Sequence, residues 1–103
     1  MSSLSTHVLD TASGRPAAGV PVRLETRSGA LLGDGVTDAD GRIAALGPAD
    51  LAEGVYVLRF DTAAYVTGFY PEVVVVFTIA DAGQHHHVPL LLSPYGYSTY
   101  RGS

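Results

Sequence analysis

Turn-forming residues interrupt this chain about every eight to twelve positions, which leaves only short stretches for regular structure. These stretches are rich in β-branched and aromatic residues, and residues 20–25 alternate apolar with other side chains. Such alternation is typical of strands that bury one face. The pattern predicts an all-β fold, an antiparallel β-sandwich of about seven or eight strands with at most one short helix.

The expected strands begin and end at these turns, and their ranges are 5–10, 20–25, 31–37, 42–46, 55–61, 72–79, 85–92 and 97–100. Residues 38–41, Asp-Ala-Asp-Gly, predict a tight hairpin turn, because Asp-Gly tolerates the positive φ that such a turn needs. The apolar run 73–79 predicts a strand buried on both faces, at the core or at a subunit interface. Residues 62–65 are compatible with one short helical turn, capped by Asp61 or Thr62.

The size and composition of the chain limit its class and its partners. With 103 residues, of which 47% are hydrophobic, it is expected to form one domain spanning residues 1–103. Six arginines stand against ten acidic residues with no basic block, so nucleic acid and membranes are not expected partners. The chain has no cysteine, leader or apolar span, which predicts a soluble, cytoplasmic protein. So apolar a domain is expected to bury surface against copies of itself.

The expected strand 85–92 has two different faces. Side chains alternate along a strand, so His85 and His87 share one face with Pro89 and Leu91. The other face carries His86, Val88, Leu90 and Leu92. We therefore expect one face to pack into the core and the other to present imidazoles.

Three side chains are candidates for chemistry. His7 lies in the first expected strand, His87 in a late strand, and Arg42 directly after a turn. An imidazole with a pKa near ~6.5 can act as acid or base at neutral pH, and a guanidinium binds a carbonyl or an oxyanion. A histidine alone in a strand is more often structural, and the sequence does not establish that the three meet. Together they would form a site for an anionic, nitrogen-rich small molecule.

No metal site is expected. His85 and His87 could hold an ion together, but no carboxylate at ligand spacing supplies a third ligand. Residues 38–41 resemble the start of a calcium loop, yet the glutamate that ends such a loop is missing, which favours the hairpin turn. The serines of the C-terminal segment lack a Gly-x-Ser-x-Gly context, so a serine-hydrolase elbow is not supported.

Three segments resemble a known family, and they are Ser5-Thr6-His7-Val8-Leu9-Asp10, Asp38-Ala39-Asp40-Gly41-Arg42 and the run from His85 to Ser103. Over its whole length the chain resembles the 5-hydroxyisourate hydrolases, the transthyretin-like proteins of urate breakdown. The C-terminal Tyr-Arg-Gly-Ser is the most specific part, because it separates the hydrolases from the hormone carrier transthyretin. That carrier also holds other residue types at the positions that match His7, Arg42 and His87.

The resemblance implies a transthyretin-like sandwich of two four-stranded sheets and a homotetramer built as a dimer of dimers. Its active sites would lie in the channel where the dimers meet. The catalytic residues it implies are His7, Arg42, His87 and Ser103. The substrate-binding residues it implies are His7, Arg42, Tyr100, Arg101 and Gly102.

The implied reaction is hydrolytic opening of the lactam ring of 5-hydroxyisourate, which gives 2-oxo-4-hydroxy-4-carboxy-5-ureidoimidazoline. Water, deprotonated by His7 or His87, would attack a ring carbonyl and break the carbon–nitrogen bond. Arg42 would stabilise the oxyanion. No metal or organic cofactor is required, and the sequence leaves open which histidine is base and which is acid.

One departure from the family and three rival functions remain. Between Tyr65 and Phe69 the chain has only Val66-Thr67-Gly68, fewer residues than the family carries there, which predicts a truncated helix. The first rival is a non-catalytic transthyretin-like protein that binds a small molecule, and against it stand the imidazoles and the guanidinium. The second is a metal-binding module that uses residues 85–87. The third is an enzyme that the short loop has inactivated.

Overall fold

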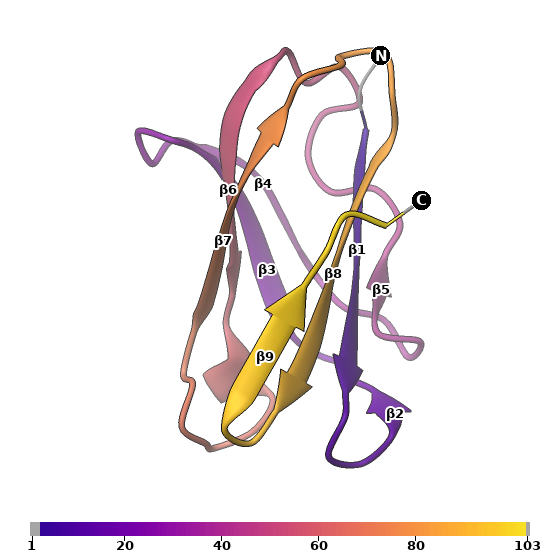
Figure 1. Cartoon of the computed structure of the whole chain (residues 1–103), viewed down its shortest axis with the longest axis vertical. Helices are drawn as coiled ribbons and strands as arrows, with labels where there is room; N and C mark the ends of the chain where they lie inside the picture. Colours follow the sequence, from indigo (N-terminus) through magenta and orange to yellow (C-terminus); the bar gives the residue numbers. More distant parts are fainter. Residues whose placement is uncertain (1–2, 103) are drawn as a thin grey trace.

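The computed structural model describes residues 3–102, which form two β-sheets packed face to face (Figure 1). The first sheet has the order β2-β1-β8-β9, with β5 also paired to β1. Its strands are β1 (Leu4–Asp10), β2 (Arg15–Pro16), β5 (Arg42–Ile43), β8 (His86–Ser93) and β9 (Gly96–Thr99). The second sheet has the order β4-β3-β6-β7, with β3 (Pro21–Thr26), β4 (Leu31–Val36), β6 (Gly54–Phe60) and β7 (Val73–Ile79). The prediction of an all-β sandwich is therefore confirmed.

The sheets differ in two details from the prediction of two antiparallel four-stranded sheets. The first has five strands, because the two-residue strands β2 and β5 pair with β1 at different positions along its length. In addition, β1 and β8 run parallel. These strands come from opposite ends of the chain, so the connection between them is long enough for the crossover that a parallel pair requires.

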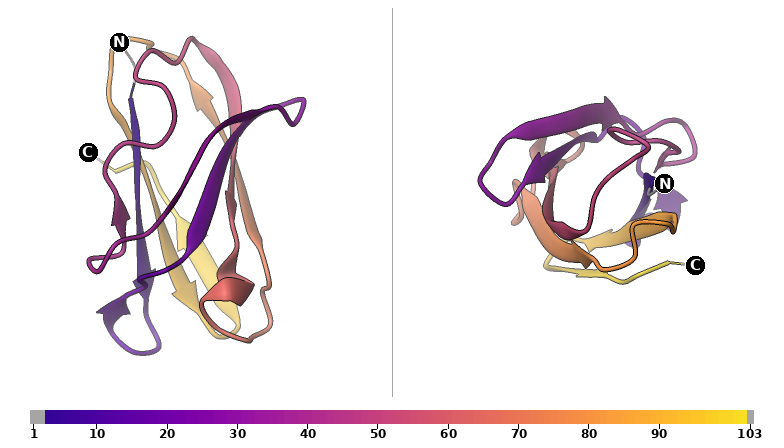
Figure 2. Two further views of the ribbon diagram at one scale, coloured as in Figure 1. Left: turned by 180° about the vertical axis from the view of Figure 1, so that it is seen from behind. Right: turned by 90° about the horizontal axis from the view of Figure 1, so that it is seen from above.

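The core lies between the two sheets, which Figure 2 shows from above as facing layers. Each strand contributes alternate side chains to it, since successive residues of a strand point to opposite faces. The largest fully buried apolar side chains are Phe60, Leu4, Leu24, Leu46, Leu58, Ile79 and Leu90. The face predicted to enter the core is confirmed, since His86, Val88, Leu90 and Leu92 are buried. On the other face His85 is exposed and His87 and Leu91 are half-buried, but Pro89 is buried as well.

The turn at residues 38–41 is tight, but the prediction that it joins a hairpin is wrong. β4 stays in the second sheet, whereas β5 pairs with β1 in the first, and the expected strand 42–46 is reduced to Arg42–Ile43. Gly41 has a φ of 74°, and its carbonyl accepts a hydrogen bond from the amide of Val8 at 2.7 Å. This bond docks the turn on β1, so the chain crosses between sheets here.

The sequence predicted that β7 is buried on both faces. Within one chain this prediction is wrong. β7 is an edge strand on which Val73, Val75 and Ile79 face the core. Val74 and Val76 point outward and are 39% and 49% exposed. The strand therefore leaves an apolar face uncovered in one chain, and its burial at a subunit interface stays a prediction.

The short helix is confirmed as a single 3-10 turn, η1 (Thr62–Ala64), but its predicted cap is not formed. The side chain of Asp61 makes no capping hydrogen bond, and the hydroxyl of Thr62 donates to the carbonyl of Tyr70 across the following loop. Because η1 has three residues, no helix within residues 3–102 is long enough to cross a bilayer.

Candidate active site

Strands β5, β1 and β8 lie side by side in the first sheet (Figure 1), and their pairing brings predicted site residues together. In the parallel pair of β1 and β8, Ser5 lies opposite His87. In the antiparallel pair of β1 and β5, His7 lies opposite Arg42. Ser5 and His7 are two positions apart on β1, so their side chains share a face. Residues that are far apart in the sequence thus become neighbours on three adjacent strands.

His87 is half-buried and is held by the hydroxyl of Ser5. Ser5 Oγ lies 2.7 Å from Nδ1 of His87 and 2.8 Å from Nε2 of His85. Ser3 Oγ lies 2.5 Å from the other ring nitrogen of His85, Nδ1. The two imidazoles and two hydroxyls therefore form one hydrogen-bonded chain, which leaves only Nε2 of His87 for chemistry.

The C-terminal segment crosses the ring of His87. The amide of Gly102 donates to the carbonyl of His87 at 2.8 Å, and the two residues form an isolated antiparallel bridge. A methyl group added to Gly102 would overlap Cδ2 of the imidazole. Glycine at this position thus allows the backbone to lie directly against the ring, which explains the glycine of the C-terminal motif.

Arg42 is presented by the turn that precedes it. Asp38 Oδ1 accepts hydrogen bonds from the amides of Asp40 and Arg42, both at 2.9 Å, and the amide of Asp38 donates to the carbonyl of Arg42. The turn is thereby fixed at both ends. The side chain of Arg42 is exposed, and no carboxylate within residues 3–102 forms an ion pair with it. Its charge is available to an anion.

The pKa of His87 lies below the usual value of an imidazole. Burial is the main cause, because it disfavours the charged form, and the charges of Arg42, His7 and His85 act in the same direction. A hydrogen bond with the backbone of Ser5 opposes the shift. His87 is therefore neutral at pH 7 and able to accept a proton.

A cavity of about 400 Å³ lies over these residues, and it is lined by Ser5, Arg42, His85, His87, Tyr100 and Gly102. His7 is not among the lining residues, but it lies beside Arg42 and its charge acts on His87. Arg101 lines a neighbouring cavity and donates to Oε1 of Gln84 at 2.8 Å. Ser103 lies outside the described residues. Most of the predicted site residues therefore lie in or beside one cavity, and Arg101 lies at the neighbouring cavity.

Ser5 and His85 were not among the residues predicted for the site. The signal was present, because the alternation of side chains places Ser5 on the face of His7 and His85 on the face of His87. What was missing is the pairing of β1 with β8, which joins the two faces. Within residues 3–102, no three histidine or acidic side chains are grouped closely enough to hold a metal ion.

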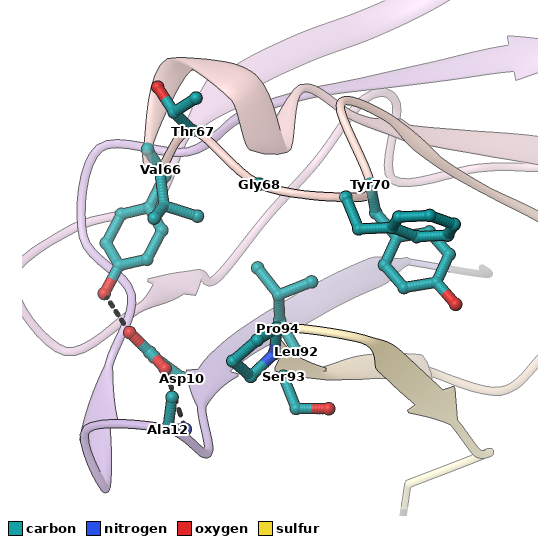
Figure 3. A pocket seen from close by; sticks show the side chains of 11 residues that line it. Asp10, Ala12, Val66, Thr67, Gly68, Tyr70, Leu92, Ser93 and Pro94 are labelled. Atoms are coloured by element: carbon teal, nitrogen blue, oxygen red, sulfur yellow. Dashed lines mark hydrogen bonds between the residues drawn. The ribbon is translucent and has the colours of Figure 1, made fainter.

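A second, more enclosed pocket of about 200 Å³ lies beside the short segment 66–68 (Figure 3). Its lining is mostly apolar, and the titratable residues in it are Asp10, Tyr65 and Tyr70. The carboxylate of Asp10 accepts hydrogen bonds from the hydroxyl of Tyr65 at 2.7 Å and from the amides of Ala12 and Ser13. These hydrogen bonds, of which that from Tyr65 is the largest cause, lower the pKa of Asp10. The carboxylate therefore has a structural role.

Comparison with known proteins decides the family. The HIUase/Transthyretin family profile matches residues 4–102. The chain belongs to this family. The 5-hydroxyisourate hydrolase of Caulobacter vibrioides is 48% identical, with 100% of both chains covered. The structure of Klebsiella pneumoniae 5-hydroxyisourate hydrolase has a TM-score of 0.88 and 42% identity, covering 98% of this chain and 99% of that one. Sea bream transthyretin in complex with thyroxine has a TM-score of 0.84 and 34% identity, covering 96% and 93%.

The resemblance expected from the sequence is therefore confirmed. The family fold serves hydrolases and a thyroxine-binding protein alike, so the fold alone does not separate the two functions. The alignment with the Caulobacter protein spans 115 positions, whereas this chain has 103 residues, so that relative contains residues that have no counterpart here.

Proposed function

We propose that this chain hydrolyses the lactam ring of 5-hydroxyisourate to 2-oxo-4-hydroxy-4-carboxy-5-ureidoimidazoline. The observation that carries the proposal is the half-buried, neutral imidazole of His87 beside an Arg42 that no described carboxylate neutralises. A base next to a free guanidinium suits attack of water on a carbonyl. Relatives named 5-hydroxyisourate hydrolase, at 48% and 42% identity over nearly the whole chain, support the same reaction.

His87 acts as the general base in this proposal, because its lowered pKa keeps it neutral. Nε2 of His87 takes a proton from water, and the hydroxide oxygen forms a bond to a ring carbonyl carbon. Arg42 stabilises the oxyanion, and the carbon–nitrogen bond then breaks as that nitrogen receives a proton from the imidazolium of His87 or from His7. The product carries the new carboxylate. No cofactor enters these steps.

The C-terminal segment shapes the site. Tyr100 and Gly102 line the cavity and Arg101 lies beside it, which suits the substrate-binding roles implied by the resemblance. A catalytic role for Ser103 stays a prediction. His7, next to Arg42, is placed to bind the substrate or to supply the second proton.

A homotetramer, as a dimer of dimers, is part of the proposal. The edge strands β7 and β9 leave apolar surface exposed, with Val76 at 49%, Tyr97 at 44% and Tyr100, just after β9, at 56%. Surfaces of this kind mark interfaces. Sedimentation equilibrium tests the assembly, and a monomer at micromolar concentration would contradict it. A cytoplasmic location also stays a prediction.

The test of the function is the ultraviolet absorbance decay of freshly generated 5-hydroxyisourate. We expect the wild-type protein to accelerate the decay, the His87→Ala variant to lose the acceleration, and a chelator to have no effect. The competing function is small-molecule binding without turnover, as the thyroxine complex of sea bream transthyretin illustrates. Saturable binding of a urate analogue with no acceleration of the decay would favour that function instead.

A further inference from the structure

The hydrogen-bonded chain behind His87 can run in either of two directions, and the proposed function selects one of them. If Nε2 of His87 is to act as a base, its lone pair must face the cavity and the ring proton must be on Nδ1. Nδ1 of His87 then donates to Ser5 Oγ, across the 2.7 Å contact. The single hydroxyl proton of Ser5 is thereby directed to Nε2 of His85, 2.8 Å away.

The same reasoning extends by one more step. Nε2 of His85 accepts from Ser5, so the proton of His85 is on Nδ1, which faces Ser3 Oγ at 2.5 Å. Every bond of the chain is satisfied with both imidazoles neutral, and the chain ends at solvent-exposed groups. The reverse direction would place the proton of His87 on Nε2 and remove the base from the cavity.

We infer that Ser5 is a positioning residue that fixes the tautomer of His87, with His85 as the acceptor that orients the Ser5 hydroxyl. This inference rests on the proposed function and adds two residues to its site. Ser5 holds the place that a carboxylate takes in a Ser-His-Asp triad, where the partner of Nδ1 also selects the tautomer. A hydroxyl differs from a carboxylate because it carries no charge, so it stabilises the imidazolium much less.

The neutral partner fits the other groups that face His87. These groups are His7 on β1, Arg42 on β5, His85 just before β8 and Tyr100 after β9. Among these groups, all within residues 3–102, none is a carboxylic acid, and the nearby charges disfavour protonation of the ring. A hydroxyl on Nδ1 thus selects the basic tautomer while it leaves the ring neutral at pH 7.

The experiment combines nitrogen-15 NMR of the imidazoles with steady-state kinetics. In the wild type we expect His87 to carry its proton on Nδ1. In Ser5→Ala the Nε2-protonated form should become populated, and kcat should fall by about tenfold to a hundredfold with little change in KM. Ser5→Thr retains the hydroxyl and should restore both readouts. Ser98→Ala, which removes an exposed hydroxyl from β9, is the matched control and should change neither.

Three outcomes would overturn the inference: a wild-type His87 protonated on Nε2, an unchanged tautomer in Ser5→Ala, or a loss of kcat that Ser5→Thr fails to restore. The wild-type spectrum decides the matter even if Ser5→Ala does not fold. The tautomer is read without substrate, so the inference about Ser5 remains testable if the wild type shows no hydrolysis. In that case the proposed function fails while the role of Ser5 is judged on the spectra alone.

Discussion

The outer faces of the two sheets differ in how their charged side chains are paired. On the second sheet, Arg59 of β6 pairs with Glu25 at 2.9 Å and with Glu72 at 3.3 Å, and Arg23 approaches Glu25 at 3.5 Å. Glu25 is 6% exposed, so these pairs cover an acid that would otherwise be buried alone. The two arginines and two glutamates on this face are thus paired with one another.

On the first sheet, Arg42 lies near the imidazoles of His7 and His87. No described carboxylate forms an ion pair with it. The face is held by neutral hydrogen bonds from Ser5 instead. Unbalanced positive charge in a cavity attracts an anion and stabilises an oxyanion. The comparison indicates that a sheet face can bind an anion where its arginine has no carboxylate partner.

The largest effect is expected at Arg42. Arg42→Ala should lower kcat/KM by about a hundredfold to a thousandfold, because the oxyanion loses its charged partner. Stability should stay nearly unchanged, since no ion pair within residues 3–102 is broken. Arg42→Lys should recover part of the activity, because lysine keeps the charge but not the planar fork. Turnover of Arg42→Ala at the wild-type rate would mean that the unbalanced charge has no catalytic use.

The next effect concerns the segment that lies against His87. In Gly102→Ala the new methyl group would overlap the imidazole, so the segment must move away from the cavity. We expect kcat to fall by about tenfold to a hundredfold, with a melting temperature close to that of the wild type. Gly96→Ala serves as control, because a Cβ there would meet only Ser93 Oγ, at 3.6 Å. Equal activity of the two variants would mean that the position of the C-terminal segment does not affect catalysis.

Local pattern predicted half of the site. Alternation along residues 85–92 placed His87 outward and Leu90 inward, because the period of a strand is a property of a few neighbouring residues. The turn before Arg42 was also predictable, from the Asp-Gly pair. Such features depend on residues that are close in the sequence.

Long-range pairing could not be predicted in the same way. The local sequence of residues 38–43 does not show that the chain passes from the second sheet to the first, where β5 pairs with β1. Nor does any local pattern show that β1 lies parallel to β8. The contact between Ser5 and His87 spans 82 positions and exists only because of that register. The exposure of Val74 likewise depends on β7 being an edge strand, which the sequence of β7 does not reveal.

A smaller effect is expected from pH. The base form of His87 is lost as the pH falls through its pKa, which burial keeps below the usual value, so kcat/KM should hold to a lower pH than an ordinary exposed imidazole would allow. The charged form of His85 lowers the pKa of His87, so the acid limb of the profile should move to higher pH in His85→Ala. Stability follows the same sign. The unfolded chain binds the proton more readily, so the contribution of His87 is present above its unfolded pKa and is lost as the pH falls through the folded pKa.

The smallest effect on activity is expected at Arg59, the counterpart of Arg42 on the second sheet. Arg59→Ala should leave kcat and KM within about twofold of the wild type, because β6 takes no part in the cavity. The melting temperature should fall slightly, since Glu25 loses its nearest cation and keeps only Arg23 at 3.5 Å. Glu25→Gln in the Arg59→Ala background removes the unpaired charge and should recover most of that loss, as thermal unfolding followed by circular dichroism will measure. A large fall in turnover for Arg59→Ala would show that the two faces are coupled, and the contrast between a balanced and an unbalanced face would no longer account for the site.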